Sequence, residues 1–210
     1  MCDPVVYLYV SENRKDLSTE ERVRIFLSRF LSDSGVDLHH ENNQPLILRT
    51  PRGKPYLPSF PDLHLSITHS GKWFICAFSA QPVGIDLQEH SLLRKETPQQ
   101  AYDRYAKIAR RFFHSNEATF VEADPKENFF PVWTAKESYV KFTGQGMDQF
   151  FDEFCVWDPY ADPARKIPEN TTWQAENAYF RQKRFDETYT FCMCTATPCA
   201  WQWIMVDKTA

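Results

Sequence analysis

Strand-like runs lie on both sides of a helical middle in this chain, and this order limits the folds that it can adopt. Before residue 98, short runs alternate apolar and polar residues; Leu63, Leu65 and Ile67, for example, have polar residues between them, as in a half-buried strand. Beyond residue 146, the strand-like texture returns. We expect strands at 4–10, 46–48, 63–68, 73–78, 83–87, 150–156, 172–175, 179–184, 188–196 and 201–206, with 73–78 and 83–87 paired as a hairpin across Gln81-Pro82.

Helical patterns occupy four stretches. The first begins at Ser18, which forms a capping box with Glu21, and ends near Gly35. Its apolar residues, from Val23 to Leu31, recur three and four positions apart and form one apolar stripe. The other helices are expected at 99–113, 116–122 and 128–143, the second of them with Ser115 as its N-cap.

A polar segment at 89–99, which contains Pro98, is the best boundary between two parts of the chain. A chain of 210 residues fits one or two domains. We therefore expect an N-terminal half at 1–98 and a C-terminal half at 99–210. Each half combines helices with strands of the antiparallel type, so the sequence predicts an α+β fold.

Charge and composition exclude several classes of protein. The net charge is −4, so no overall positive field attracts nucleic acid. The apolar run at 5–10 is short and lacks a basic leader, and no stretch is long enough to span a membrane; we expect a cytoplasmic protein with no membrane contact. Six cysteines without the C-x₂-C pairs of zinc sites predict buried or partly buried thiols. Basic residues cluster at Arg104, Lys107, Arg110 and Arg111, and again at Arg181, Lys183 and Arg184.

Two acidic motifs, one in each half, suggest a shared site. Asp86 ends the apolar run Val83-Gly84-Ile85, and Glu137 lies four residues before Lys141, so both project from one helix face. Magnesium keeps one or two protein carboxylates and fills its other positions with waters and substrate phosphates. The pattern therefore fits a magnesium-diphosphate site. Taken singly, the aspartate also fits a turn residue, and the glutamate and lysine also fit an exposed ion pair.

Two further motifs fit phosphate contacts. Thr68-His69-Ser70 follows a strand and precedes Gly71, so its imidazole and hydroxyl groups are placed to contact a phosphate or a base. A hydrogen-bonded structural histidine is the alternative. Gly53-Lys54-Pro55 is equally compatible with a phosphate contact and with a surface turn.

Taken together, these motifs closely resemble those of the 4'-phosphopantetheinyl transferases of the surfactin-synthetase type. The resemblance spans residues 53 to 141 and includes the long run Ser66 to Leu87. The ordered motifs are Gly53-Lys54-Pro55, Thr68-His69-Ser70-Gly71, Gly84-Ile85-Asp86 and Trp133-x-x-Lys136-Glu137-Ser138-x-x-Lys141.

The resemblance implies an enzyme that moves the 4'-phosphopantetheine arm of coenzyme A to a serine of an acyl or peptidyl carrier protein and releases adenosine 3',5'-bisphosphate. It also implies a pseudo-dimer of two similar α+β halves, with coenzyme A bound between them and a monomer sufficient for activity. The implied roles are nucleotide and phosphate binding for Lys54, Thr68 and His69, Mg²⁺ binding for Asp86 and Glu137, a diphosphate contact for Lys141, and general-base catalysis for Glu137.

The chain departs from this family in two places. The family usually has a second acid two residues after the aspartate; Gln88 stands here, and its amide can ligate magnesium or orient a water but brings no charge. Related enzymes also often carry a longer basic segment after the first strand. Arg14-Lys15 and Arg22 are the only nearby substitutes in this chain.

The neutral Gln88 keeps a second hypothesis open, in which the chain is a non-catalytic descendant that binds coenzyme A or a carrier protein. A nucleic-acid-binding module is a third and poorer interpretation, given the acidic charge balance. The basic cluster at 104–111, followed by Phe112-Phe113, suits docking of an acidic carrier protein, although a solvated helix face explains its charges equally well. The residues do not distinguish fatty-acid, polyketide and nonribosomal-peptide carriers.

Overall fold

The computed structural model describes residues 4–14, 16–35, 46–93, 95–146, 151–157, 167 and 169–206. Within these ranges the chain forms the helices α1 Thr19–Asp33, α2 Pro98–Phe112, α3 Ser115–Ala123 and α4 Pro125–Thr143, with a short 3₁₀ helix at Phe151–Glu153. The strands are β1 Val5–Glu12, β2 Leu48–Arg49, β3 Pro55–Tyr56, β4 His64–Ser70, β5 Trp73–Ser79, β6 Val83–Glu89, β7 Thr172–Ala175, β8 Ala178–Phe185, β9 Tyr189–Thr195 and β10 Ala200–Met205.

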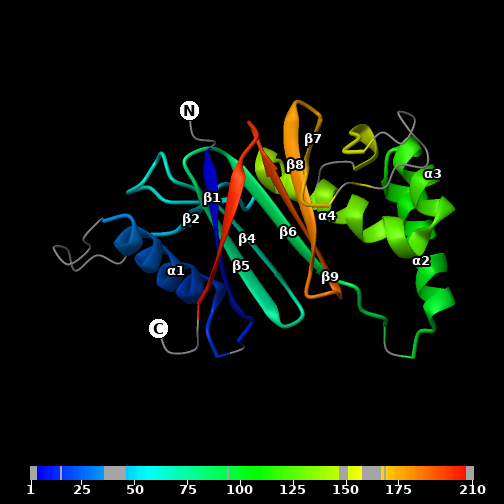
Figure 1. Ribbon diagram of the computed structural model, residues 1–210, viewed down its shortest axis with the longest axis horizontal. Coiled ribbons are helices and arrows are strands. Elements are labelled where there is room, and N and C mark those ends of the chain that lie inside the picture. Colours follow the sequence, from blue (N-terminus) through cyan, green and yellow to red (C-terminus); the bar gives the residue numbers. More distant parts are fainter. Residues whose placement is uncertain are drawn as a thin grey trace.

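Two four-stranded sheets form the centre of the molecule (Figure 1). One has the order β10-β1-β5-β4 and the other the order β6-β9-β8-β7, and a two-stranded ribbon joins β2 to β3. The strand β10 runs parallel to β1, with Val5 opposite Ala200. Because β6 pairs with β9 and β10 with β1, each sheet contains strands from both sides of residue 98. The α+β class is confirmed; the similarity of two halves stays a prediction.

The predicted hairpin between residues 73–78 and 83–87 is wrong. The strand β5 pairs with β1 along one edge and with β4 along the other, so it has no free edge for β6. The hairpin is formed by β4 and β5 instead, and Gly71 turns the chain between them at a positive φ of 50°.

A row of hydroxyl groups joins the two sheets where β4 lies beside β6. The side chains of Ser66, Thr68 and Ser70, at alternate positions of β4, accept hydrogen bonds from successive outward backbone N–H groups of β6. The donors are Ile85, Leu87 and Glu89, at N···O distances of 3.0, 3.0 and 2.9 Å. We call this row the hydroxyl seam.

Two local predictions also need correction. Phe150 lies outside the described residues, and 151–156 is a 3₁₀ turn followed by irregular backbone rather than a strand. The backbone polar groups of this segment bind side chains of two helices: the Phe154 carbonyl accepts from Lys136, and the Val156 N–H donates to Glu117.

The N-cap of α3 is His114, whose Nδ1 accepts from the Asn116 N–H, and Ser115 is the first helical residue.

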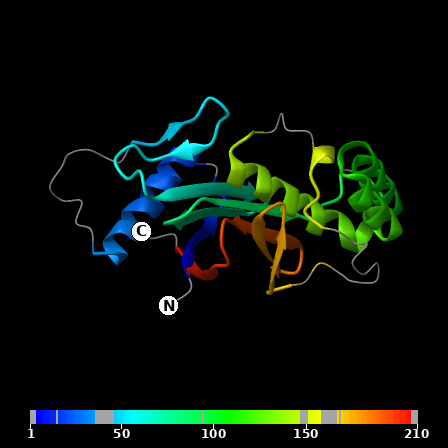
Figure 2. The ribbon, with the colours of Figure 1, turned by 90° about the horizontal axis from the view of Figure 1, so that it is seen from above.

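The helices cover the sheets from opposite ends of the molecule (Figure 2). The helix α1 begins with the predicted capping box of Ser18 and Glu21 and packs on the sheet that contains β1. The long helix α4 packs on β6 and β9, and α2 and α3 pack on α4. The apolar interior therefore has three parts, between the sheets, under α1 and around α4.

The thiols agree with the composition. The five cysteines in the described residues are free, and all are buried or half-buried, as predicted; Cys2 lies outside those residues. Among the helices of the described ranges, none combines the length and the apolar character needed to cross a membrane.

Candidate active site

The closest approach between β6 and α4 occurs at Gly84. A Cβ atom at this position would overlap the Ser138 carbonyl oxygen and the Phe142 backbone nitrogen. Only glycine therefore lets the helix lie directly against the strand. This contact brings Asp86, two residues further along β6, against the helix face that carries Glu137 and Lys141.

The carboxylate of Asp86 is buried, and both of its oxygens accept hydrogen bonds. Only 2% of this residue is exposed. Its Oδ1 accepts from Lys141 Nζ at 2.7 Å and from Thr68 Oγ1 at 3.2 Å, and its Oδ2 accepts from Gln88 Nε2 at 3.1 Å. Four predicted site residues thus meet at one carboxylate.

Glu137 differs from Asp86 in having no partner. It is 5% exposed, and its carboxylate makes no hydrogen bond or ion pair to any residue that the structure describes. Burial, and next the charge of Asp86, raise the pKa of Glu137 from 4.5 to about 7, although Lys141 lowers it. A buried carboxylate with uncompensated charge beside a second carboxylate attracts a cation.

The donor set fits a hard divalent cation. Asp86 and Glu137 offer carboxylate oxygens, and Gln88 offers an amide next to them, which suits magnesium when waters and phosphate oxygens complete the coordination. A group of three or more His, Cys, Asp or Glu side chains placed to hold a metal is absent from the described residues. The site is therefore poor in ligands for zinc, and a magnesium ion held by the two carboxylates would need waters and phosphate oxygens to complete its coordination.

A cleft of about 540 Å³ opens above these carboxylates. All of the predicted site residues line it, and Trp133 forms part of its wall. The lining residues are Thr19, Arg49, Arg52, Gly53, Lys54, Pro55, Leu65, Ser66, Ile67, Thr68, His69, Asp86, Gln88, Trp133, Glu137, Val140, Lys141, Gly144 and Gly146.

The structure gives Lys54, Thr68 and His69 different environments. The Lys54 Nζ donates to the Phe142 carbonyl at the end of α4, at 2.6 Å, and burial lowers its pKa. The Thr68 hydroxyl donates to Asp86 Oδ1 and, within the hydroxyl seam, accepts from the Leu87 N–H, so it positions Asp86. His69 is exposed in the cleft, with its ring stacked over Phe74.

The arginines predicted to replace the missing basic segment do not line the cleft. Arg14 pairs with Asp16, and the guanidinium of Arg22 binds Asn13 and the Leu17 carbonyl. Lys15 lies outside the described residues. Arg49 and Arg52, which the sequence analysis missed, line the cleft instead; their closeness to Lys54 in the sequence was the available signal.

The basic cluster on α2 lies along a separate groove of about 660 Å³, lined by Lys107 and Arg111 among others. Two of its members are already paired, Arg104 with Glu96 and Arg110 with Glu122. Phe112 is exposed, as a docking residue should be, but Phe113 is buried in the core around α4 and is excluded from this role.

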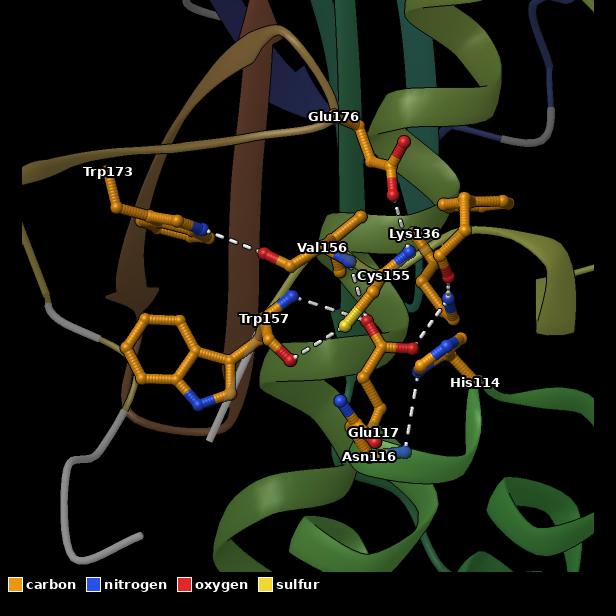
Figure 3. A network of polar contacts seen from close by, with 10 residues as sticks. His114, Asn116, Glu117, Lys136, Cys155, Val156, Trp157, Trp173 and Glu176 are labelled. Carbon is orange, nitrogen blue, oxygen red and sulfur yellow. Dashed lines mark hydrogen bonds and ion pairs between the residues drawn. The ribbon is translucent and has the colours of Figure 1, made fainter. Parts of the chain in front are cut away.

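Lys136, next to Glu137, points to the opposite side of α4 into a buried polar network (Figure 3). Its Nζ pairs with Glu117 at 2.6 Å and donates to the Phe154 carbonyl at 2.7 Å. Figure 3 also shows the other oxygen of Glu117 facing the backbone N–H groups of Val156 and Trp157. The network fixes residues 154–157 against α3 and α4 and thereby supports the helix that carries the site.

Comparison with known proteins shows the family of the chain. The family model described as the 4'-phosphopantetheinyl transferase superfamily matches residues 82–194. The chain is 32% identical to the 4'-phosphopantetheinyl transferase Sfp of Bacillus subtilis (strain 168) over 151 residues, 70% of this chain and 61% of that protein. It is 33% identical to the 4'-phosphopantetheinyl transferase gsp of Aneurinibacillus migulanus over 147 residues, 68% of this chain and 54% of that protein. The chain thus spans between half and two thirds of the length of these relatives.

Proposed function

This chain belongs to the 4'-phosphopantetheinyl transferase superfamily, and on that premise we propose that it transfers the 4'-phosphopantetheine arm of coenzyme A to a serine of a carrier protein. The observation that carries the proposal is the pair of buried carboxylates at the floor of the cleft, Asp86 bound by Lys141 and Glu137 without a partner. An acyl or peptidyl carrier is the expected partner, and monomeric state and cytoplasmic location stay predictions.

The reaction assigns each residue a role. The serine oxygen of the carrier attacks the phosphorus that bears the pantetheine arm, a new P–O bond forms, and the P–O bond to adenosine 3',5'-bisphosphate breaks. Glu137 is the proposed general base and takes the serine proton, directly or through a water. Lys141 faces the diphosphate oxygens and stabilises the charge that develops on them.

Asp86 and Glu137 would hold Mg²⁺, with Gln88 beside them. The bound ion would polarise the phosphoryl group and offset the charge of the leaving bisphosphate. Lys54 and His69 line the cleft on the side where the nucleotide is proposed to lie, and Thr68 keeps Asp86 in place.

The alternative is a protein that binds coenzyme A or a carrier without catalysis. The neutral Gln88 motivates it. The intact Glu137 and Lys141 favour the enzyme, because together with Asp86 they offer the carboxylates and the cation that metal-assisted phosphoryl transfer uses.

Intact mass of apo carrier proteins tests the proposal. Fatty-acid, polyketide and peptide carriers are incubated with the protein, coenzyme A and Mg²⁺, and in parallel with EDTA. We expect a metal-dependent gain of one phosphopantetheine group.

Glu137→Gln should lower the rate by about 10²- to 10⁴-fold while keeping coenzyme A affinity within a few fold. Glu187→Gln, an exposed change in the β8–β9 turn, is the matched control and should keep the wild-type rate. Coenzyme A binding without any mass gain would favour the binder.

A further inference from the structure

A line of polar side chains lies between α4 and the sheet that contains β6. Asp86 of β6, Cys192 of β9 and Gln182 of β8 are neighbours across this sheet, because Cys192 is paired with Asp86 on one side and with Gln182 on the other. Residues that face one another across strands point to the same face of a sheet. Here that face is the one covered by α4, as the contacts of Asp86 and Gln182 with this helix show. We call these three residues the polar row.

The helix α4 is bound at both ends of the polar row. At one end, Lys141 Nζ pairs with Asp86 Oδ1 at 2.7 Å. At the other end, Gln182 Nε2 donates to Thr134 Oγ1 at 3.1 Å. Thr134 and Lys141 are seven residues, or about two helical turns, apart, so they lie on the same face of α4. The row therefore restricts how this face lies on the sheet.

The contact with Gln182 lies where the backbone ladder of α4 is interrupted. Pro131 stands inside the helix, and proline has no N–H to donate. Gln182 Nε2 donates to the Pro131 carbonyl at 2.9 Å as well as to Thr134, and an amide nitrogen carries the two hydrogens that these bonds need. The Thr134 hydroxyl passes its own hydrogen to the Phe130 carbonyl at 2.9 Å. Because helices bend most readily at proline, this bridge restricts the direction of the turns that follow.

Those following turns carry the groups of the proposed reaction. Glu137 comes six residues after Pro131, which is about 9 Å along the helix axis. A turn of the helix by about 6° at the proline would therefore move Glu137 by about 1 Å, a displacement that can lower a reaction rate by about 10²-fold. The close approach at Gly84 anchors α4 at Ser138, just after Glu137, and Gln182 anchors it before Glu137.

We infer that Gln182 is a positioning residue for the transfer reaction: from β8 it holds α4 at Pro131 and Thr134 and so sets where Glu137 meets Asp86. This inference rests on the proposed function. Gln182 is only 2% exposed and is not among the residues that line the cleft, so it acts through the helix and not on the substrate.

Removal of the amide with little change in side-chain size tests this role. Gln182→Met should lower the kcat of transfer to a carrier protein, followed by intact mass, by about 10- to 100-fold. The KM for coenzyme A should stay within about threefold, because every residue that lines the cleft is kept. Gln174→Met, an exposed change on β7 of the same sheet, is the matched control and should keep the wild-type kcat.

Gln182→Glu distinguishes a lost hydrogen-bond donor from altered packing. A protonated carboxyl group has nearly the shape of the amide and can donate to the Pro131 carbonyl, whereas a carboxylate can only accept. The kcat of this variant, divided by the wild-type kcat at the same pH, should therefore fall by about fivefold or more between about pH 5.5 and 8.5, because burial raises the pKa of a glutamate toward this range. The same ratio for Gln182→Met should not change with pH.

The outcomes separate this role from the proposed function. A wild-type kcat in Gln182→Met, or a ratio for Gln182→Glu that does not change with pH, would overturn the positioning role and leave the proposed function standing, since the wild type still modifies the carrier. If Gln182→Met does not fold, the ratio for Gln182→Glu decides alone. A wild type that modifies none of the carriers would overturn the proposed function and, with it, this inference.

Discussion

His90 follows β6, and its titration affects the stability of the fold. Its ring stacks on Phe130 with 4.3 Å between centroids, and its Nε2 shares a hydrogen bond with Thr190 Oγ1 at 2.8 Å. Burial, and next the charge of Arg184, lower the pKa of His90 from 6.5 to about 4, against the opposite effect of Glu127.

The lowered pKa of His90 makes the fold less stable at acidic pH. Between about pH 4 and 6.5 the unfolded histidine binds a proton and the folded one does not, so the free energy of unfolding falls as the pH is lowered through this range. The full effect is about 2–3 kcal/mol. Urea unfolding at pH 4.5, 5.5 and 7 should show that His90→Gln removes this part of the pH dependence. A variant with the wild-type slope would contradict the assignment.

The buried pair of Lys136 and Glu117 makes a second prediction at the level of single residues. Lys136→Met should lower the free energy of unfolding by about 3–5 kcal/mol, because it leaves a buried carboxylate without its cation. The double variant Glu117→Gln, Lys136→Met should lose less, since a neutral amide still accepts from the Val156 N–H. Urea unfolding of both variants measures the difference. A double variant no more stable than Lys136→Met would contradict the explanation.

A residue of the site could be predicted from the sequence where the spacing within one motif fixes the direction of its side chain. The spacing of Glu137 and Lys141 fixes them to one helix face. Asp86 was expected at the end of its strand, but it lies in the middle of β6 and is buried, so its meeting with Lys141 did not follow from its own motif. The role of Thr68 did not follow from its motif either, because its partner Leu87 lies on another strand. Arg52 was missed since nothing local indicates that it reaches Gln145, 93 residues away.

Among the elements, the contact between β6 and α4 depends on one glycine. Gly84→Ala should push the helix off the strand, lower the free energy of unfolding by about 3 kcal/mol or more, and reduce transfer by about 10²-fold, because it moves Asp86 away from Glu137 and Lys141.

Gly35→Ala is the matched control for this change. Gly35 has a positive φ of 75° but no neighbouring atom within 4 Å, so alanine should cost only about 1–2 kcal/mol and leave transfer unchanged. Equal losses of transfer in the two variants, measured by intact mass, would mean that the close approach at Gly84 is unimportant.

Helices were more predictable than strand pairing. Capping residues and the 3.6-residue period are local, and they placed α1, α2 and α4 within a few residues of their observed bounds. A strand can pair with a strand from any part of the chain, so local sequence does not identify its partner. The predicted hairpin of β5 with β6 was therefore wrong. The strand at 150–156 failed because its apolar residues pack equally well from an irregular segment whose polar groups are bound by Glu117 and Lys136.

For the whole molecule, the exchange of strands between the sheets predicts a single unfolding transition. The first sheet needs β10 from the end of the described chain, and the second needs β6 from before residue 98. Each sheet is therefore completed by a strand from the other side of residue 98, which couples the folding of the two. Urea unfolding followed by tryptophan fluorescence and by far-ultraviolet circular dichroism should give coincident curves. Separate transitions would instead favour two independent halves divided near residue 98.

The hydroxyl seam has a consequence for association between chains. An outermost strand presents unpaired backbone groups that can recruit a strand from another molecule. The strands β4 and β6 are both outermost in their sheets, yet they lie against each other, and the hydroxyls of Ser66, Thr68 and Ser70 occupy the outward N–H groups of β6. The seam thus closes these two edges to strand addition with side chains, whereas β10 and β7 are the other outermost strands of the two sheets.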